Sequence, residues 1–354
     1  MNKMKELWKR VTGFSLLFPL VCLVIVLVVN LIKTPDFFKI SMNNGVLYGY
    51  VIDILNRSSE LIILAVGMTL VVAASGGTDI SVGAVSAVAG AVCIYSLIGG
   101  ASSSVYRIPY VLAIVLGILA GTACGAFNGF LVAKLHIQPM VATLILFTAG
   151  RGMAQVLTQG FILYVRKESF KFLGNFLPGV PIPTPIFIAT IVVVLTFLIL
   201  KKTSLGLYIQ SVGVNRKASR LVGLNSSLII FLAYVFSGFC AGIAGMIITS
   251  RVYSIDANNA GLNIELDAIL AVAIGGNSLG GGKFSLAGSV IGAITIQALT
   301  TSLYAMKVTA DQLPVYKAVV VIIIVALQSP IVKRWMKNIK QKLASSRNGK
   351  KVEA

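Results

Sequence analysis

Charged side chains are rare in this 354-residue sequence, and a few lie inside long apolar stretches. Asp79 follows a pair of glycines, Arg151 lies within an apolar run, and Glu265 and Asp267 open another. A charge at the centre of a membrane helix costs about 2.5–3.5 kcal/mol on insertion scales, so such residues usually have a function or a partner. We therefore expect a polar path, or a structural ion pair that faces the inside of a helix bundle.

Each of these charges also has an ordinary structural explanation. Glu265 and Asp267 could equally cap a helix N-terminus at the membrane interface, where the helix dipole favours carboxylates. For Arg151, a buried pairing role is favoured over direct contact with a substrate. These alternatives remain open on the sequence alone.

No set of residues has the spacing of a hydrolytic or redox site. Gly280, Gly281, Gly282 and Lys283 resemble part of a phosphate-binding loop, but that pattern requires glycine at position 277 and Ser or Thr at position 284. The lone His136 and the four cysteines lack metal-ligand spacing and are interpreted as structural. The sequence favours passage or signalling across a membrane, with any energy supplied by another protein.

Composition places these residues in a membrane protein. Hydrophobic residues make up 57% of the chain and charged residues 12%, against about a quarter charged in soluble domains, and the mean hydropathy is +0.92. The net charge of +19 needs no nucleic-acid partner, because Lys and Arg gather in the cytoplasmic loops of membrane proteins. We predict an all-α, polytopic membrane fold.

A membrane helix needs about 20 apolar residues. Ten segments qualify as spans or half-spans: 11–32, 58–75, 79–99, 109–133, 138–159, 184–200, 227–249, 265–275, 285–303 and 314–329. The first is interpreted as a retained anchor, because its apolar run is too long for a signal peptide. The segment 265–275 is short, and 79–99 could be a re-entrant element.

Basic residues orient these spans. With the N-terminus inside, the cytoplasmic segments carry nineteen Lys and Arg and the outer segments carry ten. Positive charge favours the cytoplasmic side, so both termini are expected inside. The predicted organisation is a cytoplasmic N-terminus (1–10), one transmembrane domain (11–330) and a basic cytoplasmic tail (331–354).

Two glycine-rich segments, 76–83 and 275–282, each separate an apolar helix from a helix rich in small residues. Small residues let membrane helices approach closely, and breaks between half-helices often mark translocation sites. Two tight turns between packed helices would give the same pattern.

The predicted cytoplasmic loop 203–226 is the long, basic one. Gly213 and Gly223 are expected to end a short helix over 214–222, since glycine accepts positive φ and close backbone contact. Asn215, Arg216 and Arg220 could then donate hydrogen bonds to a cytoplasmic partner. The alternative is a solvated connection.

Segment 76–83 reads Gly-Gly-Thr-Asp-Ile-Ser-Val-Gly and resembles the signature Gly-Gly-Ile-Asp-Leu-Ser-Val-Gly of permease subunits of ribose/galactose-type sugar ABC importers. Further blocks agree in order and spacing: 128–134 with 138–144, 213–225, and 265–282. The resemblance covers about 45–330. Thr78 departs from the signature, where Ile is usual. Segments 52–57, 149–155 and 256–262 look most like the galactofuranose permeases of this family.

The resemblance implies an importer with a second permease subunit, a cytoplasmic ATPase that binds the ATP, and an extracytoplasmic sugar-binding protein, in a bacterial plasma membrane. No cofactor or catalytic residue is expected in this chain. The implied path candidates are Thr78, Asp79, Ser81, Asn128, Arg151, Glu265, Asp267 and Asn277. The implied ATPase-coupling residues are Gly213, Asn215, Arg216, Arg220 and Gly223.

Three other functions compete with a sugar permease. An ion-coupled secondary transporter would need several buried carboxylates along its spans, and few are seen. A branched-chain amino-acid ABC permease belongs to the same transport class with a different substrate. A membrane enzyme is disfavoured by the missing catalytic set.

Overall fold

The computed structural model describes residues 16–34, 36–43 and 45–328. The chain forms two compact units, Met1–Ser302 and Leu303–Ala354. The expected N-terminal segment 1–10 and the basic tail 331–354 lie outside the described residues.

Apolar segments become helices where the sequence predicts them. The helices are α2 (Leu17–Lys33), α3 (Tyr50–Ser75), α4 (Val82–Ile98), α5 (Tyr110–Ala133), α6 (Pro139–Thr158), α7 (Thr184–Lys202), α8 (Leu205–Val214), α9 (Arg216–Leu221), α10 (Ser226–Val252), α11 (Ile264–Ile274), α12 (Leu286–Ala305) and α13 (Leu313–Gln328). Each of the ten expected segments coincides with one of them. Among the described residues, six helices (α3, α5, α6, α7, α10 and α12) are long and apolar enough to cross a membrane.

The chain is mostly helical, and the few strands are an addition to the expected all-α fold. β1 (Ser41–Asn43) pairs antiparallel with β2 (Val46–Tyr48), and β3 (Leu163–Tyr164) pairs antiparallel with β4 (Ser254–Ile255). A 3₁₀ helix, η1 (Glu168–Leu173), follows β3. Strands of two or three residues are too short for an alternating pattern to reveal them.

Helices α3 and α10 form the core of the first unit. α10 packs against α5, α3 and α4, and α3 packs against α7, α8 and α11. The α5–α10 contact depends on glycine, because a Cβ on Gly121 would lie 2.8 Å from the carbonyl oxygen of Gly238. Close approach of this kind holds membrane helices together by van der Waals contact.

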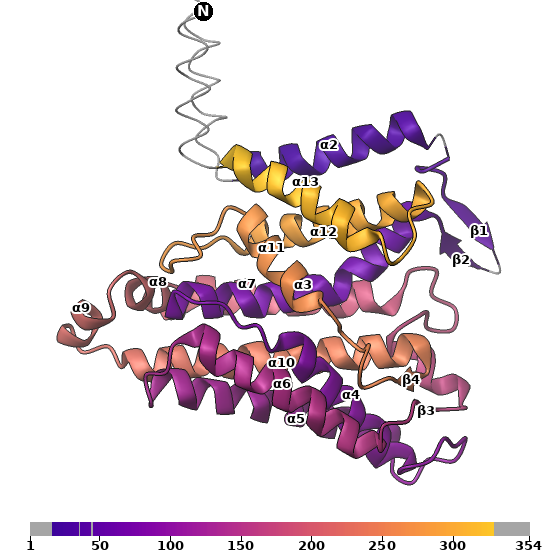
Figure 1. Cartoon of the computed structure of the whole chain (residues 1–354), viewed down its shortest axis with the longest axis horizontal. Coiled ribbons are helices and arrows are strands. Elements are labelled where there is room, and N and C mark those ends of the chain that lie inside the picture. The colour runs from indigo at the N-terminus through magenta and orange to yellow at the C-terminus, as the bar shows by residue number, and fades with distance from the viewer. Residues whose placement is uncertain (1–15, 35, 44, 329–354) are drawn as a thin grey trace, which may run out of the picture. The chain divides into compact units, whose positions relative to one another are not determined.

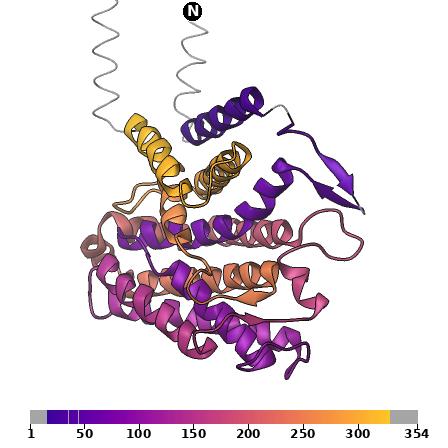
Figure 2. The same ribbon diagram turned by 45° about the vertical axis from the view of Figure 1, so that its right-hand side comes forward.

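Most connections of this unit lie at two opposite ends, while the segments that lead into α4 and α11 run inward (Figures 1 and 2). At one end, Arg216 of α9 donates to the carbonyl of Ala133 at the end of α5, beside α8. At the other end, β3 joins β4, and Ser103 of the α4–α5 connection forms a bridge with Val165. Loops expected inside and loops expected outside lie at different ends, and we label the two ends inner and outer after that expectation.

Candidate translocation path and coupling site

The first glycine break is organised by a buried carboxylate. Gly76 ends α3 in the left-handed conformation (φ 66°), and α4 begins at Val82. One oxygen of Asp79, Oδ1, accepts hydrogen bonds from the backbone N–H (3.0 Å) and the hydroxyl (2.6 Å) of Ser81. The other, Oδ2, accepts from the hydroxyl of Ser237 on α10 (3.0 Å). The carboxylate therefore fixes the start of α4 and ties it to α10.

Neighbouring helices extend this network. The hydroxyl of Ser81 also accepts a hydrogen bond from Nδ2 of Asn128 on α5 (2.8 Å). Thr143 on α6 accepts one from the backbone N–H of Ile80 (3.2 Å). Asp79, Ser81 and Asn128 are almost fully enclosed by protein, and Thr78 is 9% exposed. Three of the path candidates thus form one buried network in this conformation, with Thr78 at its edge.

The second break is organised by an amide in the same way. Oδ1 of Asn277 accepts a hydrogen bond from the backbone N–H of Ser285, just before α12. Its Nδ2 donates to the carbonyl of Val272 on α11 (2.9 Å) and to the hydroxyl of Ser289 on α12 (2.8 Å). Ser289 is also hydrogen-bonded to Thr69 of α3 (2.6 Å). This side chain therefore connects the two helices that flank the break to α3.

Three glycine-containing segments meet at the inner end. The backbone N–H of Gly282 donates to the carbonyl of Ala73 in the last turn of α3 (3.0 Å). A Cβ on Gly213 of α8 would lie 1.8 Å from that carbonyl oxygen and 2.6 Å from the nitrogen of Gly282. A Cβ on Gly76 would lie 2.9 Å from the carbonyl oxygen of Gly280. The expected coupling loop thus touches the last turn of α3, just before the first glycine break, and Gly282 of the second, backbone against backbone. We call this contact the glycine junction.

The glycine junction corrects the expected bounds of the loop helix. Gly213 does not end a helix over 214–222: it lies inside α8, where its missing side chain allows the contact just described. The chain breaks instead at Asn215 (φ −155°), whose side chain accepts a hydrogen bond from the backbone N–H of Ala218 and caps α9. Gly223 follows α9 with φ 84°, the positive value expected for it.

Both arginines of this loop have partners within the chain. Arg216 donates to the carbonyl of Ala133 (2.9 Å) and to the hydroxyl of Ser227 (3.1 Å). Arg220 donates to the hydroxyls of Ser226 (2.8 Å) and Ser227 (3.1 Å). These side chains therefore brace α9 against the start of α10. The loop also exposes three apolar side chains, since Val214, Leu221 and Val222 are 74%, 89% and 76% exposed, next to the exposed Lys217.

Arg151 and Glu265 approach the start of α4 from the outer side. Arg151 on α6 donates through Nη1 to the carbonyls of Ala257 and Ala260, in the segment that leads into α11. Glu265, 2% exposed, lies in the first turn of α11 with its Oε2 against Gly83. Asp267 follows, half-buried. Within the described residues, Oε2 of Glu265 and two nitrogens of Arg151 have no hydrogen-bond partner.

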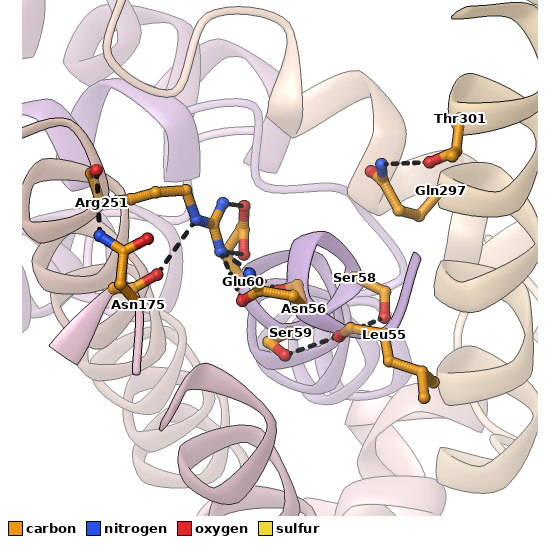
Figure 3. A network of polar contacts seen from close by, with 10 residues as sticks. Leu55, Asn56, Ser58, Ser59, Glu60, Asn175, Arg251, Gln297 and Thr301 are labelled. Atoms are coloured by element: carbon orange, nitrogen blue, oxygen red, sulfur yellow. Dashed lines mark hydrogen bonds and ion pairs between the residues drawn. The ribbon is translucent and has the colours of Figure 1, made fainter. Parts of the chain in front are cut away.

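One buried ion pair was missed at the sequence level. Arg251 at the end of α10 forms a salt bridge with Glu60 of α3, and it also donates to the carbonyl of Asn56 (3.1 Å) (Figure 3). Asn175 donates to the carbonyl of Arg251 (3.3 Å). The signal was available, because Glu60 is a carboxylate inside the expected span 58–75. Its partner, 191 residues away, could not be read from the sequence.

The histidine and the cysteines form no metal-binding cluster in the described part of the chain. No group of three or more His, Cys, Asp or Glu side chains lies close enough together there to hold a metal ion. Cys22, Cys93 and Cys240 are buried free thiols, and Cys124 is partly buried. His136 is exposed and hydrogen-bonded to the carbonyl of Lys134 (2.8 Å).

Comparison with known proteins gives a consistent set of relatives. A family model described as "Branched-chain amino acid transport system / permease component" matches residues 50–327. The galactofuranose transporter permease of Escherichia coli K12 is 45% identical over 314 residues, 88% of each chain. The fructose import permease of Bifidobacterium longum is 39% identical over 98% of this chain and 96% of its own. The ribose import permease of Escherichia coli K12 is 35% identical over 88% of this chain and 92% of its own.

Proposed function

The chain belongs to this family of ABC-importer permeases, and from that premise we propose that it forms the membrane path by which a simple sugar enters a bacterial cell. The observation that carries the proposal is sequence identity of 35–45% to three sugar-import permeases over nearly the whole chain. The sugars named for these relatives are galactofuranose, fructose and ribose. A galactofuranose-like monosaccharide is the first substrate to test.

Energy for transport comes, in this proposal, from a separate ATPase. The apolar tip of α8 and α9 (Val214, Leu221 and Val222) docks into that ATPase, while Arg216 and Arg220 hold the tip in place. Movement of the tip passes through Gly213 to the end of α3 and to the loop 275–285. The support for this route is the glycine junction, where a Cβ would collide with backbone atoms of both elements.

The polar residues at the two glycine breaks are proposed to control the path rather than to bind sugar tightly. Asp79, Ser81, Asn128 and Asn277 hold the breaks, so a shift at the glycine junction would move the ends of α4 and α12. Thr78, Arg151, Glu265 and Asp267 lie around the start of α4 and α11 and are proposed to face the sugar as it passes. A soluble binding protein outside the cell would capture the sugar with high affinity.

We further propose ten membrane segments with both termini in the cytoplasm, in a bacterial inner or plasma membrane, and a dimer with a second permease subunit. The support is the charge bias of the sequence and the grouping of the loops at two ends of the first unit. The chain itself is proposed to carry no catalytic site, and ATP is proposed to bind to the separate ATPase.

A deletion strain tests the proposed substrate class. Cells that lack the gene should lose uptake of one labelled sugar among galactofuranose, fructose and ribose, and the intact gene should restore it. Leucine is the matched probe, because the family model is described by amino-acid transport. Loss of leucine uptake with normal sugar uptake would replace the sugar by a branched-chain amino acid.

A further inference from the structure

Helix α6 exposes two polar side chains, Thr148 and Gln155, among exposed side chains that are otherwise apolar. Thr148, Gly152 and Gln155 are exposed and follow one another at spacings of four and three, which places them on one helical face. The opposite face, with Leu146, Gly150 and Ala154, is buried in the bundle. The hydroxyl of Thr148 donates to its own helix, so the amide of Gln155 is the group that requires a polar environment.

A second polar surface adjoins the first. Asn258 and Asn259 are exposed on the segment 256–263, and Nε2 of Gln155 donates to Oδ1 of Asn258. The carboxylate of Asp256 fixes this turn by accepting hydrogen bonds from the backbone N–H of Asn258 (3.0 Å) and from Nδ2 of Asn259 (2.7 Å). The amides of Gln155 and Asn258 are thus hydrogen-bonded to each other, and Asn259 follows on the same turn.

This amide cluster (Gln155, Asn258 and Asn259) is continuous with the first glycine break. Arg151, one turn before Gln155, holds the segment 256–263 through the carbonyls of Ala257 and Ala260. The same segment reaches Gly83 in the first turn of α4, where a Cβ on Gly261 would lie 3.0 Å from the carbonyl oxygen of Gly83. Asp79 and Ser81 of the first network lie four and two residues before Gly83.

We propose that the amide cluster lines the outer mouth of the sugar path and selects among sugars there. The proposal rests on the function proposed above. Neutral amides both donate and accept hydrogen bonds, as adjacent sugar hydroxyls require. The two segments that contribute the amides are also two of the segments in which this sequence resembles the galactofuranose permeases.

Cysteine accessibility tests the mouth directly. Gln155→Cys and Val156→Cys place a thiol at nearly the same depth on α6, but in directions that differ by about 100° around the helix axis. Val156 is 77% exposed and apolar, so it serves as the lipid-facing control. A charged, membrane-impermeant methanethiosulfonate is added outside intact vesicles, with the unmodified chain as the baseline for its own cysteines.

We expect Gln155→Cys to react at least tenfold faster than Val156→Cys and to lose sugar uptake on modification. Equal reaction rates at the two positions would overturn the proposal. So would no reaction at either position, because this face of α6 would then be packed against a second permease subunit. If the unmodified chain imports no sugar, the proposed function fails instead. These failures are therefore distinguishable.

Asn258→Leu provides a second readout that does not depend on labelling. Loss of one amide should lower uptake of the preferred sugar about two- to tenfold and change the ratio of galactofuranose to ribose uptake, with sugar binding to the binding protein unchanged. An equal loss for both sugars would contradict a role in selection.

Discussion

Substitution of Gly213 by alanine is the smallest change that perturbs the glycine junction. The new Cβ would lie 1.8 Å from the carbonyl oxygen of Ala73, whereas real Cβ atoms essentially never approach a heavy atom within 3.0 Å. Helix α8 must therefore move at least 1.2 Å away from the end of α3. Both contacting atoms belong to backbone, so no side chain can rotate to relieve the collision.

The size of the effect follows from this collision. Overpacking of a well-packed contact costs about 1–3 kcal/mol. A coupling free energy of that size corresponds to roughly 5- to 150-fold. We expect Gly213→Ala to lower ATP turnover stimulated by the binding protein, and sugar uptake, by at least about fivefold. Gly213→Val should be more severe, because its two methyl groups add to the same collision.

The assay uses purified chain reconstituted with its ATPase and binding protein. Gly223→Asn is the matched control in the same loop, since a Cβ at Gly223 meets nothing within 4 Å and Asn tolerates positive φ. The amount of inserted permease is measured for every variant. Normal stimulation and uptake in Gly213→Ala, at normal insertion, would refute a coupling route through the glycine junction.

Three further predictions follow from buried polar contacts and from charge. Asp79→Ala should abolish most sugar uptake at near-normal insertion, because the hydroxyls of Ser81 and Ser237 lose their buried acceptor. Each unsatisfied hydroxyl costs about 1–3 kcal/mol. Normal uptake by an inserted variant would show that the carboxylate only caps a helix. Arg251→Ala should lower stability in detergent by about 3–5 kcal/mol, measured by thermal unfolding, because it leaves Glu60 charged and buried, whereas an unchanged unfolding temperature would argue against a structural ion pair. A reporter fused after Lys351 should be active only in the cytoplasm, and activity outside the cell would reverse the proposed topology.

Much of the helical framework could be predicted because it depends on local sequence. Apolar runs of sufficient length predicted ten helices, and the breaks at Gly76 and Gly275 lie where glycine interrupts those runs. The start of α3 was placed at residue 58 instead of Tyr50, because Asp53 and Arg57 make its first turns polar. Helix bounds were least accurate where polar residues continue an apolar helix.

The site could be predicted only in part because its contacts are non-local. The sequence singled out Asp79 as a costly buried acid, but Ser237, its partner, lies 158 residues further along the chain. It selected Gly213 for positive φ and for close backbone contact, and the structure shows the close contact, with Ala73 as the partner that the sequence could not name. It expected Arg216 and Arg220 to point toward a partner protein, and both bind their own chain.

Transport in proteoliposomes tests the central claim most directly. The chain is reconstituted with its ATPase, ATP is supplied on the ATPase side, and the binding protein with labelled galactofuranose is supplied on the other. We predict that the sugar accumulates only when ATP and the binding protein are both present, and that collapse of proton and sodium gradients has no effect. Uptake that proceeds without ATP and stops when those gradients collapse would contradict an ABC importer and establish an ion-coupled transporter instead.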